Sequence, residues 1–395
     1  MKYPLGFNTW DNKEITQISK VLKSGNFVMG KKVKVFEKKF AKYFNSKHAV
    51  MVNSGSSANL LMLSLIKYFP DFLKKKKIKN PNIIVPAVGW STSYYPISQC
   101  GFKLKFVDID LQTLNIDTKK VEFAVDKNTV AILPINLLGK PCNYNELNRI
   151  AKKNKLILLE DNCESMGATY NGRFCGTMGL MGTHSLFFAH HMQTMEGGMI
   201  LTNDNKINDI LRSLRAHGWA RDLPNKNQLY KKKNDMFKDK FTFILPGYSV
   251  RPLEIEAAAG LVQIKKLKKF LKIRLQNSVI FKNLFKDKDW CQIQEEDKNS
   301  KSSWYGFNII LRGELKNKRH QIVKKLIKNK IEVRPTMTGN FTKNPVIKFL
   351  NHEIFGKLTK SNIVDKDGFF LGNYPKDLSK ELKLVYKIIT KELIK

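Results

Sequence analysis

Two adjacent histidines are the residues of this chain best suited to proton transfer. His190 and His191 follow an apolar run that begins after Ser185, and they precede the glycines Gly197 and Gly198. An imidazole takes up and releases protons near neutral pH, so either ring could act as a general base and then as a general acid. A metal site is disfavoured, because no third histidine or carboxylate lies nearby at metal-ligand spacing. Ring packing or a loop hydrogen bond is the structural alternative for each ring.

A short serine- and glycine-containing sequence offers a different chemistry. Ser54-Gly55-Ser56-Ser57 stands between an apolar stretch, 49–52, and an apolar stretch with helical character, 58–66. The N–H groups at a helix N-terminus attract a phosphate, and glycine lets the backbone approach it closely. A serine that caps the helix is the plainer interpretation, and these residues alone leave both open.

A third candidate is the carboxylate of Asp161, which directly follows the apolar run 156–159 and Glu160. An acid at the carboxyl end of a parallel strand lies where α/β sheets bind their ligands. Asp161 could pair with a protonated ring nitrogen of a ligand. Alternatively, it could cap the turn that follows the strand.

These residues need a scaffold, and the apolar pattern predicts one that alternates strands with helices. Apolar runs predict strands over 49–52, 83–85, 104–107, 130–133, 156–159, 199–201 and 307–310. Amphipathic or apolar spacing predicts helices over 14–22, 33–43, 58–66, 255–271, 321–327 and from about 382. The alternation indicates an α/β fold with a largely parallel sheet, and a Lys- and Asn-rich segment, 225–240, is expected to be an exposed loop.

The charge of the chain is strongly positive, but its composition argues against a nucleic-acid partner. Lys and Arg number 70 against 34 acidic residues, a formal net charge of +36, and 60 of the 70 are lysines. A nucleic-acid-binding groove would be expected to contain more arginine, because a guanidinium group forms paired hydrogen bonds to phosphates and bases better than a lysine ammonium group does. The densest basic stretches, 74–77 and 231–233, lack interleaved aromatic residues for base stacking. We therefore expect a solvated basic surface whose field favours an anionic small substrate.

Length and cysteine content place further limits on the protein. A chain of 395 residues suits one large and one small domain. The five cysteines are widely spaced and form no CxxC pair, which disfavours a zinc site or a disulfide framework. No apolar run approaches the roughly 20 residues of a membrane span, and the N-terminus lacks an apolar signal core. A cytoplasmic protein that contacts no membrane is expected.

Seven motifs in this order resemble the pyridoxal-phosphate sugar aminotransferases, the DegT/DnrJ/EryC1/StrS family. The matching stretches are 27–30, 53–59, 86–92, 107–110, 138–141, 160–161 and 247–252. The resemblance covers nearly the whole chain. It implies a type I aminotransferase fold, with a large domain whose mostly parallel sheet is flanked by helices and a smaller C-terminal α+β domain. The expected division is an N-terminal arm and cofactor-binding domain over 1–255, then a linking helix and small domain over 256–395.

The resemblance also implies a role for each matched residue. Gly55, Ser56 and Ser185 would hold the phosphate of pyridoxal 5'-phosphate, and Trp90 would stack on its ring. Asp161 would pair with the ring nitrogen.

The remaining implied contacts depart in part from the family pattern. Glu164 stands near the ring hydroxyl, where the family often has Gln or His. Family members are homodimers with the site at the interface, and Ser249 replaces the asparagine that usually reaches across it.

One departure changes the chemistry that the resemblance implies. The family's lysine, which binds the cofactor covalently, would stand at His190, and no lysine occurs from 156 to 205. About seven or eight would be expected by chance in a window of that length. The resemblance therefore narrows to the nucleotide-sugar 3-dehydratase branch, in which histidine replaces this lysine. Further stretches that match the branch are 3–5, 9–11, 90–96, 190–192, 215–219 and 334–341.

This branch implies removal of the 3-hydroxyl group from a nucleotide-linked 4-keto-6-deoxyhexose, with GDP-4-keto-6-deoxy-D-mannose as the expected substrate. His190 would be the catalytic residue. L-Glutamate would regenerate the pyridoxamine 5'-phosphate form, and Arg251, Arg334 and Arg215 are the candidates to bind substrate carboxylates. The product would be a dideoxysugar of the kind used in lipopolysaccharide O-antigens. No metal is expected. An aminotransferase without the usual lysine and a non-catalytic binding or regulatory protein are the alternatives.

Overall fold

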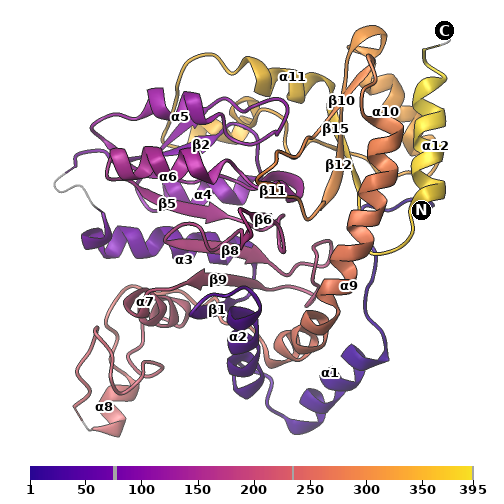
Figure 1. The fold of residues 1–395 in the computed structure, drawn as a ribbon. Coiled ribbons are helices and arrows are strands. Elements are labelled where there is room, and N and C mark those ends of the chain that lie inside the picture. Colours follow the sequence, from indigo (N-terminus) through magenta and orange to yellow (C-terminus); the bar gives the residue numbers. More distant parts are fainter. Residues whose placement is uncertain (74–77, 234, 394–395) are drawn as a thin grey trace.

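The computed structural model describes residues 1–73, 78–233 and 235–393, and an eight-stranded sheet lies at its centre (Figure 1). The strand order is β1-β9-β8-β5-β4-β2-β3-β14. β9 runs antiparallel to both its neighbours, whereas every pair from β8 to β14 is parallel. The bounds are His48–Val52 (β1), Asn82–Pro86 (β2), Lys103–Val107 (β3), Thr129–Ile132 (β4), Ile157–Asp161 (β5), Met181–Ser185 (β8), Gly198–Thr202 (β9) and His352–Ile354 (β14). The predicted α/β class is confirmed.

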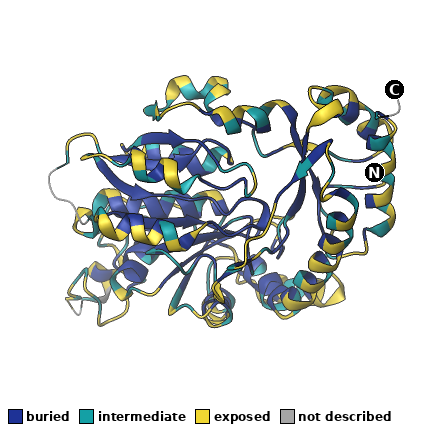
Figure 2. Ribbon diagram, turned by 45° about the horizontal axis from the view of Figure 1, so that its top comes forward, coloured by how far each residue is buried: buried dark blue, intermediate teal, exposed yellow. Residues whose placement is uncertain are grey.

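Helices cover both faces of this sheet, which explains why strands such as β2 and β5 contain uninterrupted apolar runs. Along β2, Ile83 and Val85 pack into one core and Ile84 packs into the other. Figure 2 shows buried strands between helices whose outer sides are exposed. The first core contains residues of α3 (Gly55–Tyr68), α4 (Ser91–Gln99) and α7 (Asn205–Arg215), and the second contains α5 (Thr118–Ala124) and α6 (Tyr144–Lys153).

The long helix α9 (Glu254–Phe285) connects the large sheet to a second sheet. It contacts α1 (Asn12–Ser24) and α2 (Lys31–Tyr43) near its start. It is longer than the predicted helix, 255–271. Phe281 and Phe285 continue it because they are fully buried in the core of the second sheet, a tertiary contact that the local pattern does not reveal.

The second sheet is four-stranded, in the order β10-β12-β15-β13. Its strands are Cys291–Ile293 (β10), Gly306–Leu311 (β12), Arg334–Pro335 (β13) and Gly368–Gly372 (β15), with helices Arg319–Lys328 (α10), Thr359–Asp367 (α11) and Ser379–Thr390 (α12). Two segments cross the expected boundary at 255/256. Tyr3 packs in the core of the second sheet, and β14 forms an edge of the large sheet.

The segment between α7 and α9 projects away from the large sheet (Figure 1). The predicted exposed loop, 225–240, lies in this excursion, but its last part forms the short helix α8 (Met236–Lys240). The basic stretch 74–77 lies outside the described residues. Within the described parts of the chain, no helix is both long and apolar enough to cross a membrane. Three short strands, Thr169–Tyr170 (β6), Arg173–Phe174 (β7) and Ser300–Lys301 (β11), form a third sheet.

Candidate active site

A cavity of about 290 Å³ lies between the carboxyl ends of the large sheet and the second sheet. Strand ends β5 and β8 and the start of α3 form one wall, and residues around β12, β13 and β15 form the other. The structure brings eight of the predicted site residues to this one cavity: Gly55, Ser56, Trp90, Asp161, Glu164, Ser185, His190 and Arg334. Their positions in the chain span 280 residues, so only the fold brings them together.

Asp161 lies at the end of β5, where its carboxylate is held from two sides. Asn59 Nδ2 donates to Oδ2 at 2.8 Å and Ser93 Oγ donates to the same oxygen at 2.6 Å. The Cys163 N–H donates to Oδ1 at 3.1 Å. These donors fix the orientation of the carboxylate at the cavity, where it can accept a further hydrogen bond from a ring N–H.

The start of α3 combines a serine cap with an unusually close backbone contact. Ser54 caps the helix by accepting from the Ser57 N–H at 3.0 Å, so the capping interpretation is confirmed. The other N–H groups of the first turn have no acceptor within the helix. A Cβ atom at Gly55 would lie 2.8 Å from Ser185 Cβ. The start of α3 therefore presents helix N–H groups and serine hydroxyls to the cavity, and these are donors suited to a phosphate.

His190 lies in the loop between β8 and β9, with its ring at the cavity. Its Nδ1 lies 2.9 Å from the Cys163 carbonyl oxygen, which only accepts, so Nδ1 carries the proton and Nε2 has a free lone pair. The ring packs against Tyr305 with 5.1 Å between centroids. Burial, with a smaller contribution from the Arg274 guanidinium, lowers the pKa of His190 to about 4. The imidazole is therefore neutral near pH 7 and can accept a proton at Nε2.

His191 has different surroundings from its neighbour. It is fully buried and does not line the cavity. Its Nε2 lies 3.1 Å from the Ser303 carbonyl oxygen, and its Nδ1 has no hydrogen-bond partner among the described residues. His184, by comparison, packs between the rings of Phe40 and Phe44. Among these three histidines, only His190 reaches the cavity.

Glu164 is a buried carboxyl group held by the backbone of a tight turn. Its Oε2 accepts from the Leu138 N–H at 2.9 Å, and Leu138 adopts a left-handed conformation with φ 52°. Burial raises the pKa of Glu164 to about 8, and the negative charge of Asp161 adds to the rise. Glu164 is thus protonated near neutral pH and can donate a hydrogen bond into the cavity.

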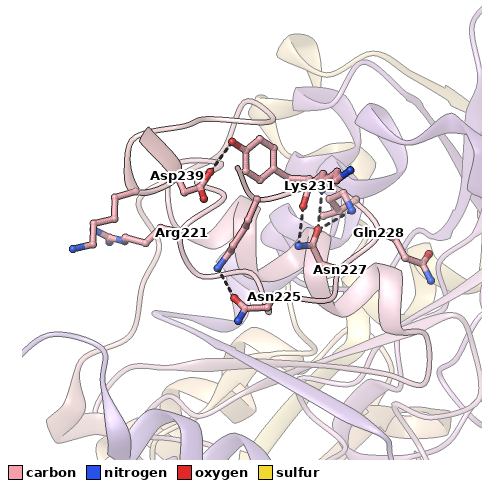
Figure 3. A pocket seen from close by; sticks show the side chains of 10 residues that line it. Arg221, Asn225, Asn227, Gln228, Lys231 and Asp239 are labelled. Atoms are coloured by element: carbon pink, nitrogen blue, oxygen red, sulfur yellow. Dashed lines mark hydrogen bonds between the residues drawn. The ribbon is translucent and has the colours of Figure 1, made fainter. Parts of the chain in front are cut away.

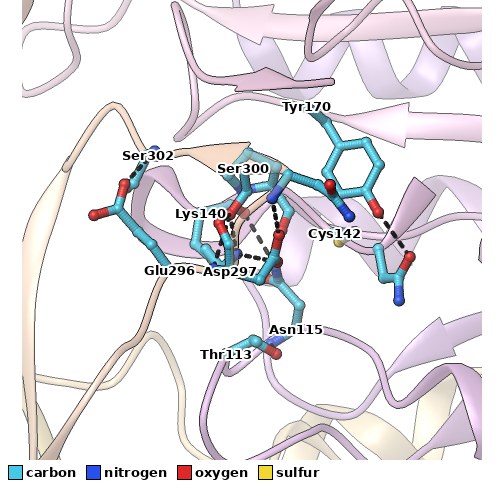
Figure 4. A network of polar contacts seen from close by, with 12 residues as sticks. Thr113, Asn115, Lys140, Cys142, Tyr170, Glu296, Asp297, Ser300 and Ser302 are labelled. Carbon is cyan, nitrogen blue, oxygen red and sulfur yellow. Dashed lines mark hydrogen bonds and ion pairs between the residues drawn. The ribbon is translucent and has the colours of Figure 1, made fainter. Parts of the chain in front are cut away.

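A polar network beside this turn ties it to the segment that leads into the second sheet (Figure 4). The buried Lys140 Nζ donates to Asp297 at 2.7 Å and also to the Ser300 hydroxyl. In addition, the Leu138 carbonyl accepts from the Tyr305 N–H at 3.1 Å. The turn therefore connects Glu164 to Tyr305, the ring that packs on His190.

The DegT/DnrJ/EryC1/StrS aminotransferase family matches residues 8–390 of the chain. The chain belongs to this family. The GDP-4-keto-6-deoxy-D-mannose 3-dehydratase of Yersinia pseudotuberculosis is 47% identical over 394 residues, 99% of each chain. A solved structure of the E. coli GDP-4-keto-6-deoxy-D-mannose-3-dehydratase with bound hydrated PLP is 47% identical, with a TM-score of 0.93 over 98% of both chains. A structure of this type of dehydratase with a trapped PLP-glutamate geminal diamine has the same identity and TM-score and covers 98% of this chain and 99% of its own.

The structure contradicts the expectation that Arg215 binds the substrate. Arg215 does not line the cavity. Its guanidinium is buried, and Nη1 bonds Glu37 Oε1 at 2.6 Å and the Met51 carbonyl at 2.7 Å. Because both partners lie in the protein interior, Arg215 stabilises the packing of α7 against α2 and β1 in this arrangement and is not placed to bind substrate.

Two other candidates, Ser249 and Arg251, lie outside the cavity of their own chain. Ser249 is exposed and pairs with Ala216 through a β-bridge. Arg251 lies at the end of the excursion, 5.7 Å from the ring of Trp219, and Arg221 lies 3.7 Å from the same ring. Among the described residues, neither side chain is held by a buried ion pair of the kind that Arg215 forms with Glu37.

Sequence reasoning missed several residues that line this family site or support it. Ser93 binds Asp161, Tyr305 packs on His190, and Arg274 donates to the backbone behind both rings. Ser93 stands one turn of helix after Trp90, a spacing that was a usable signal. Tyr305 and Arg274 had none, since each reaches the site only through the packing of α9 and the second sheet.

A larger cavity of about 760 Å³ lies in the excursion (Figure 3). Its polar side chains are largely engaged with one another: Tyr230 donates to Asp239 at 2.9 Å, and Lys232 donates to Asn225 at 3.4 Å. None of the residues that match the family motifs line this larger cavity. We therefore identify the smaller cavity as the candidate active site, because of the residues that line it and not because of its size. The described residues contain no group of three or more His, Cys, Asp or Glu side chains that could hold a metal ion.

Proposed function

We propose that this chain is a pyridoxal-phosphate-dependent 3-dehydratase of a nucleotide-linked 4-keto-6-deoxyhexose, with GDP-4-keto-6-deoxy-D-mannose as substrate. The observation that carries the proposal is the presence of His190, and of no lysine among the described lining residues, in the cavity where an aminotransferase of this family needs a lysine. The names of the relatives at 47% identity support the same reaction and the same nucleotide. The product is a 4-keto-3,6-dideoxy sugar, which suits lipopolysaccharide O-antigen synthesis.

Residues of the cavity have the chemistry to hold the cofactor. Gly55, Ser56 and Ser185 bind its phosphate at the start of α3, where helix N–H groups and hydroxyls converge. Asp161 would accept from its ring nitrogen, and Trp90, which lines the cavity and is half exposed, would stack on its ring. The bound cofactor would supply the electron withdrawal that lets the bond to the 3-hydroxyl group break. Protonated Glu164 donates a hydrogen bond to the ring hydroxyl.

His190 moves the protons of this reaction. Its neutral Nε2 would accept the proton released when a C–H bond at the benzylic carbon of the bound cofactor breaks, and the imidazolium would then donate that proton to the oxygen that leaves carbon 3. The carbon–oxygen bond breaks with both electrons on oxygen, and the donated proton converts the leaving hydroxide to water. The Nδ1–H bond to the Cys163 carbonyl keeps the ring in the orientation and tautomer that this role requires.

L-Glutamate is proposed as the amine donor, in keeping with the PLP-glutamate adduct named in a solved relative. Its carboxylates require guanidinium groups. Arg334 lines the cavity and is exposed, and its one ion pair with the described residues is a long contact to Glu332 at 3.4 Å, so it is accessible to an anionic ligand. Arg251 is the second candidate.

A homodimer with the site at its interface accounts for the position of Ser249 and Arg251. Both lie where the segment between α7 and α9 returns to the body of the chain beside the end of α7, and from there they would complete a partner's cavity. A cytoplasmic location suits the five free cysteines. The division into a cofactor-binding domain, 1–255, and a small domain, 256–395, remains a prediction.

The decisive experiment incubates the protein with GDP-4-keto-6-deoxy-D-mannose, pyridoxal phosphate and L-glutamate, and follows the sugar by mass spectrometry. A dehydratase yields a sugar that has lost the 3-oxygen, together with ammonia. An aminotransferase yields an amino sugar without ammonia, which would contradict the proposal. Absence of any turnover would favour a non-catalytic binding protein instead.

A further inference from the structure

A buried arginine lies directly behind the site. Arg274 of α9 is only 2% exposed, and it forms no ion pair with the described residues. Burial lowers its pKa to about 10, so it is still charged at neutral pH. An unpaired buried charge is costly, and an apolar side chain of similar size would usually be more stable there. Stability alone therefore does not explain this residue.

The hydrogen bonds of Arg274 converge on the backbone of the site. Nη1 donates to the Tyr305 carbonyl at 3.3 Å and to the Asn373 carbonyl, and Nη2 makes a long contact of 3.5 Å with the His190 carbonyl. Asn373 in turn donates to the Arg274 carbonyl at 3.1 Å. One rigid guanidinium group thus joins α9, the His190 loop and the second sheet.

We infer that Arg274 is a positioning residue that holds His190 and Tyr305 in register, so that the imidazole stays packed on the tyrosine ring with Nε2 in the cavity. This inference rests on the proposed role of His190. The geometry that supports it is the pair of carbonyl contacts on the two residues whose rings lie 5.1 Å apart.

The charge of Arg274 acts on the same imidazole. The other titratable groups around His190 are Asp161, Cys163, Glu164, His191 and Tyr305, and Glu196 and Arg334 line the same cavity. Asp161 raises the pKa of His190, whereas the Arg274 guanidinium lowers it, in the same direction as burial. Arg274 therefore helps to keep His190 in the neutral form that accepts a proton.

Two substitutions separate the charge from the geometry. Arg274→Met removes both the charge and the hydrogen bonds. Arg274→Lys keeps the charge but loses the planar guanidinium group that bonds several carbonyl oxygens at once. The pKa of His190 is measured in the full chain, without added cofactor, by NMR of histidines labelled with ¹³C at Cε1, and the resonance is assigned with His190→Asn. We expect Arg274→Met to raise this pKa by about 1 unit and Arg274→Lys to leave it close to that of the wild type.

Steady-state kinetics provide the second measurement. We expect kcat to fall about tenfold or more in both variants while KM changes less than about twofold, because ring placement affects the reaction more than substrate binding. Arg319→Lys is the matched control, since Arg319 also donates to two backbone carbonyls, those of Asp365 and Gly368, but in the second-sheet region. It should change neither the His190 pKa nor kcat.

Two results would overturn the inference. One is a folded Arg274→Met protein whose His190 pKa and kcat both equal those of the wild type. If Arg274→Met does not fold, an unchanged kcat in Arg274→Lys overturns it. The NMR measurement does not depend on the substrate, so it still tests Arg274 if the wild-type protein fails to dehydrate the sugar and the proposed function is wrong.

Discussion

His190 and His191 are neighbours in the chain with opposite surroundings. His190 presents one ring nitrogen to the cavity, and its other nitrogen is fixed by the Cys163 carbonyl. His191 is enclosed and bonds only the Ser303 carbonyl. At the scale of single residues, chemistry depends on which ring has a free lone pair next to the substrate.

The first prediction separates the roles of these two rings. His190→Asn should lower kcat for dehydration by about 10²–10⁴-fold, the usual contribution of a general acid–base group, and leave cofactor binding largely intact. His191→Asn should retain activity, although loss of a buried contact lowers its stability. Turnover and cofactor absorbance are measured for both. An inactive His191→Asn beside an active His190→Asn would reverse the assignment.

The second prediction concerns the missing lysine. Borohydride treatment followed by peptide mapping should find no pyridoxyl-lysine in the wild-type protein, because no described lining residue of the cavity is a lysine. His190→Lys should gain a covalent cofactor adduct and lose dehydration, since an amine at this position can capture the cofactor. Stoichiometric labelling of a wild-type lysine, or full dehydratase activity of His190→Lys, would refute the proposed role of His190.

The third prediction concerns the pH dependence of stability at Glu164. Its folded pKa, about 8, lies above the ordinary value of 4.5, so the folded state favours the protonated carboxyl group. Stability from this group is complete below pH 4.5 and is lost as the pH rises through about 8. Glu164→Gln should therefore gain stability relative to the wild type between pH 5 and about 8, by at most about 1.4 kcal/mol per pH unit.

Urea unfolding at several pH values measures this difference. The same exchange at the exposed Glu314 is the control and should produce no comparable trend. A stability difference between Glu164→Gln and wild type that does not change with pH would mean that the carboxyl group is ionised in the folded protein.

At the scale of elements, the turn at residues 137–139 links the two halves of the site. It carries the N–H donor to Glu164 and the carbonyl that accepts from Tyr305. Lys140 fixes the turn from behind through Asp297 and Ser300 (Figure 4). The positions of Glu164 and Tyr305 are therefore coupled through one short connection.

The fourth prediction follows from the unequal exposure of this ion pair. The Lys140 side chain is 1% exposed, whereas that of Asp297 is 43% exposed. Asp297→Ala leaves a buried ammonium group without its counter-charge and should lower the free energy of unfolding by about 1–3 kcal/mol. Lys140→Met removes the buried charge and leaves a carboxylate that water can solvate, so it should cost less. Denaturant unfolding measures the loss of unfolding free energy in each variant. A larger loss in Lys140→Met than in Asp297→Ala would contradict this account.

At the scale of the whole molecule, the segment between α7 and α9 projects away from the large sheet (Figure 1). It carries Ser249, which is exposed, and Arg251, both near the point where it returns to the body of the chain. A dimer in which each excursion completes the partner's cavity gives these residues a role. The surplus of lysine, by contrast, lies outside the site and is consistent with a solvated surface.

The fifth prediction tests such sharing between subunits. His190→Asn and Arg251→Ala should each be nearly inactive as homodimers. Mixing them after reversible dissociation should restore activity to about one quarter of the wild-type value, because half of the dimers are mixed and each contains one complete site. No recovery from a mixture shown to contain mixed dimers would place both residues in the same chain's site.

The sequence by itself determined the family, the fold class and most of the site. Ordered local motifs such as 53–59 and 160–161 lie at strand ends, and parallel strands bring their carboxyl ends to one edge, so Gly55, Ser56 and Asp161 could be placed together in advance. The substitution of His190 for the family lysine was equally visible, because it is a change in one residue type at a fixed spacing.

The tertiary structure alone decided which long side chains serve the site. Arg215 and Arg274 are both buried arginines on helices. The matched stretch 215–219 pointed to Arg215, and no motif pointed to Arg274. Packing places Arg215 against Glu37 and Arg274 behind His190 and Tyr305. The end of α9 at Phe285 was likewise set by the core of the second sheet. Such contacts join residues far apart in the chain, so they arise only when the two sheets and α9 pack together.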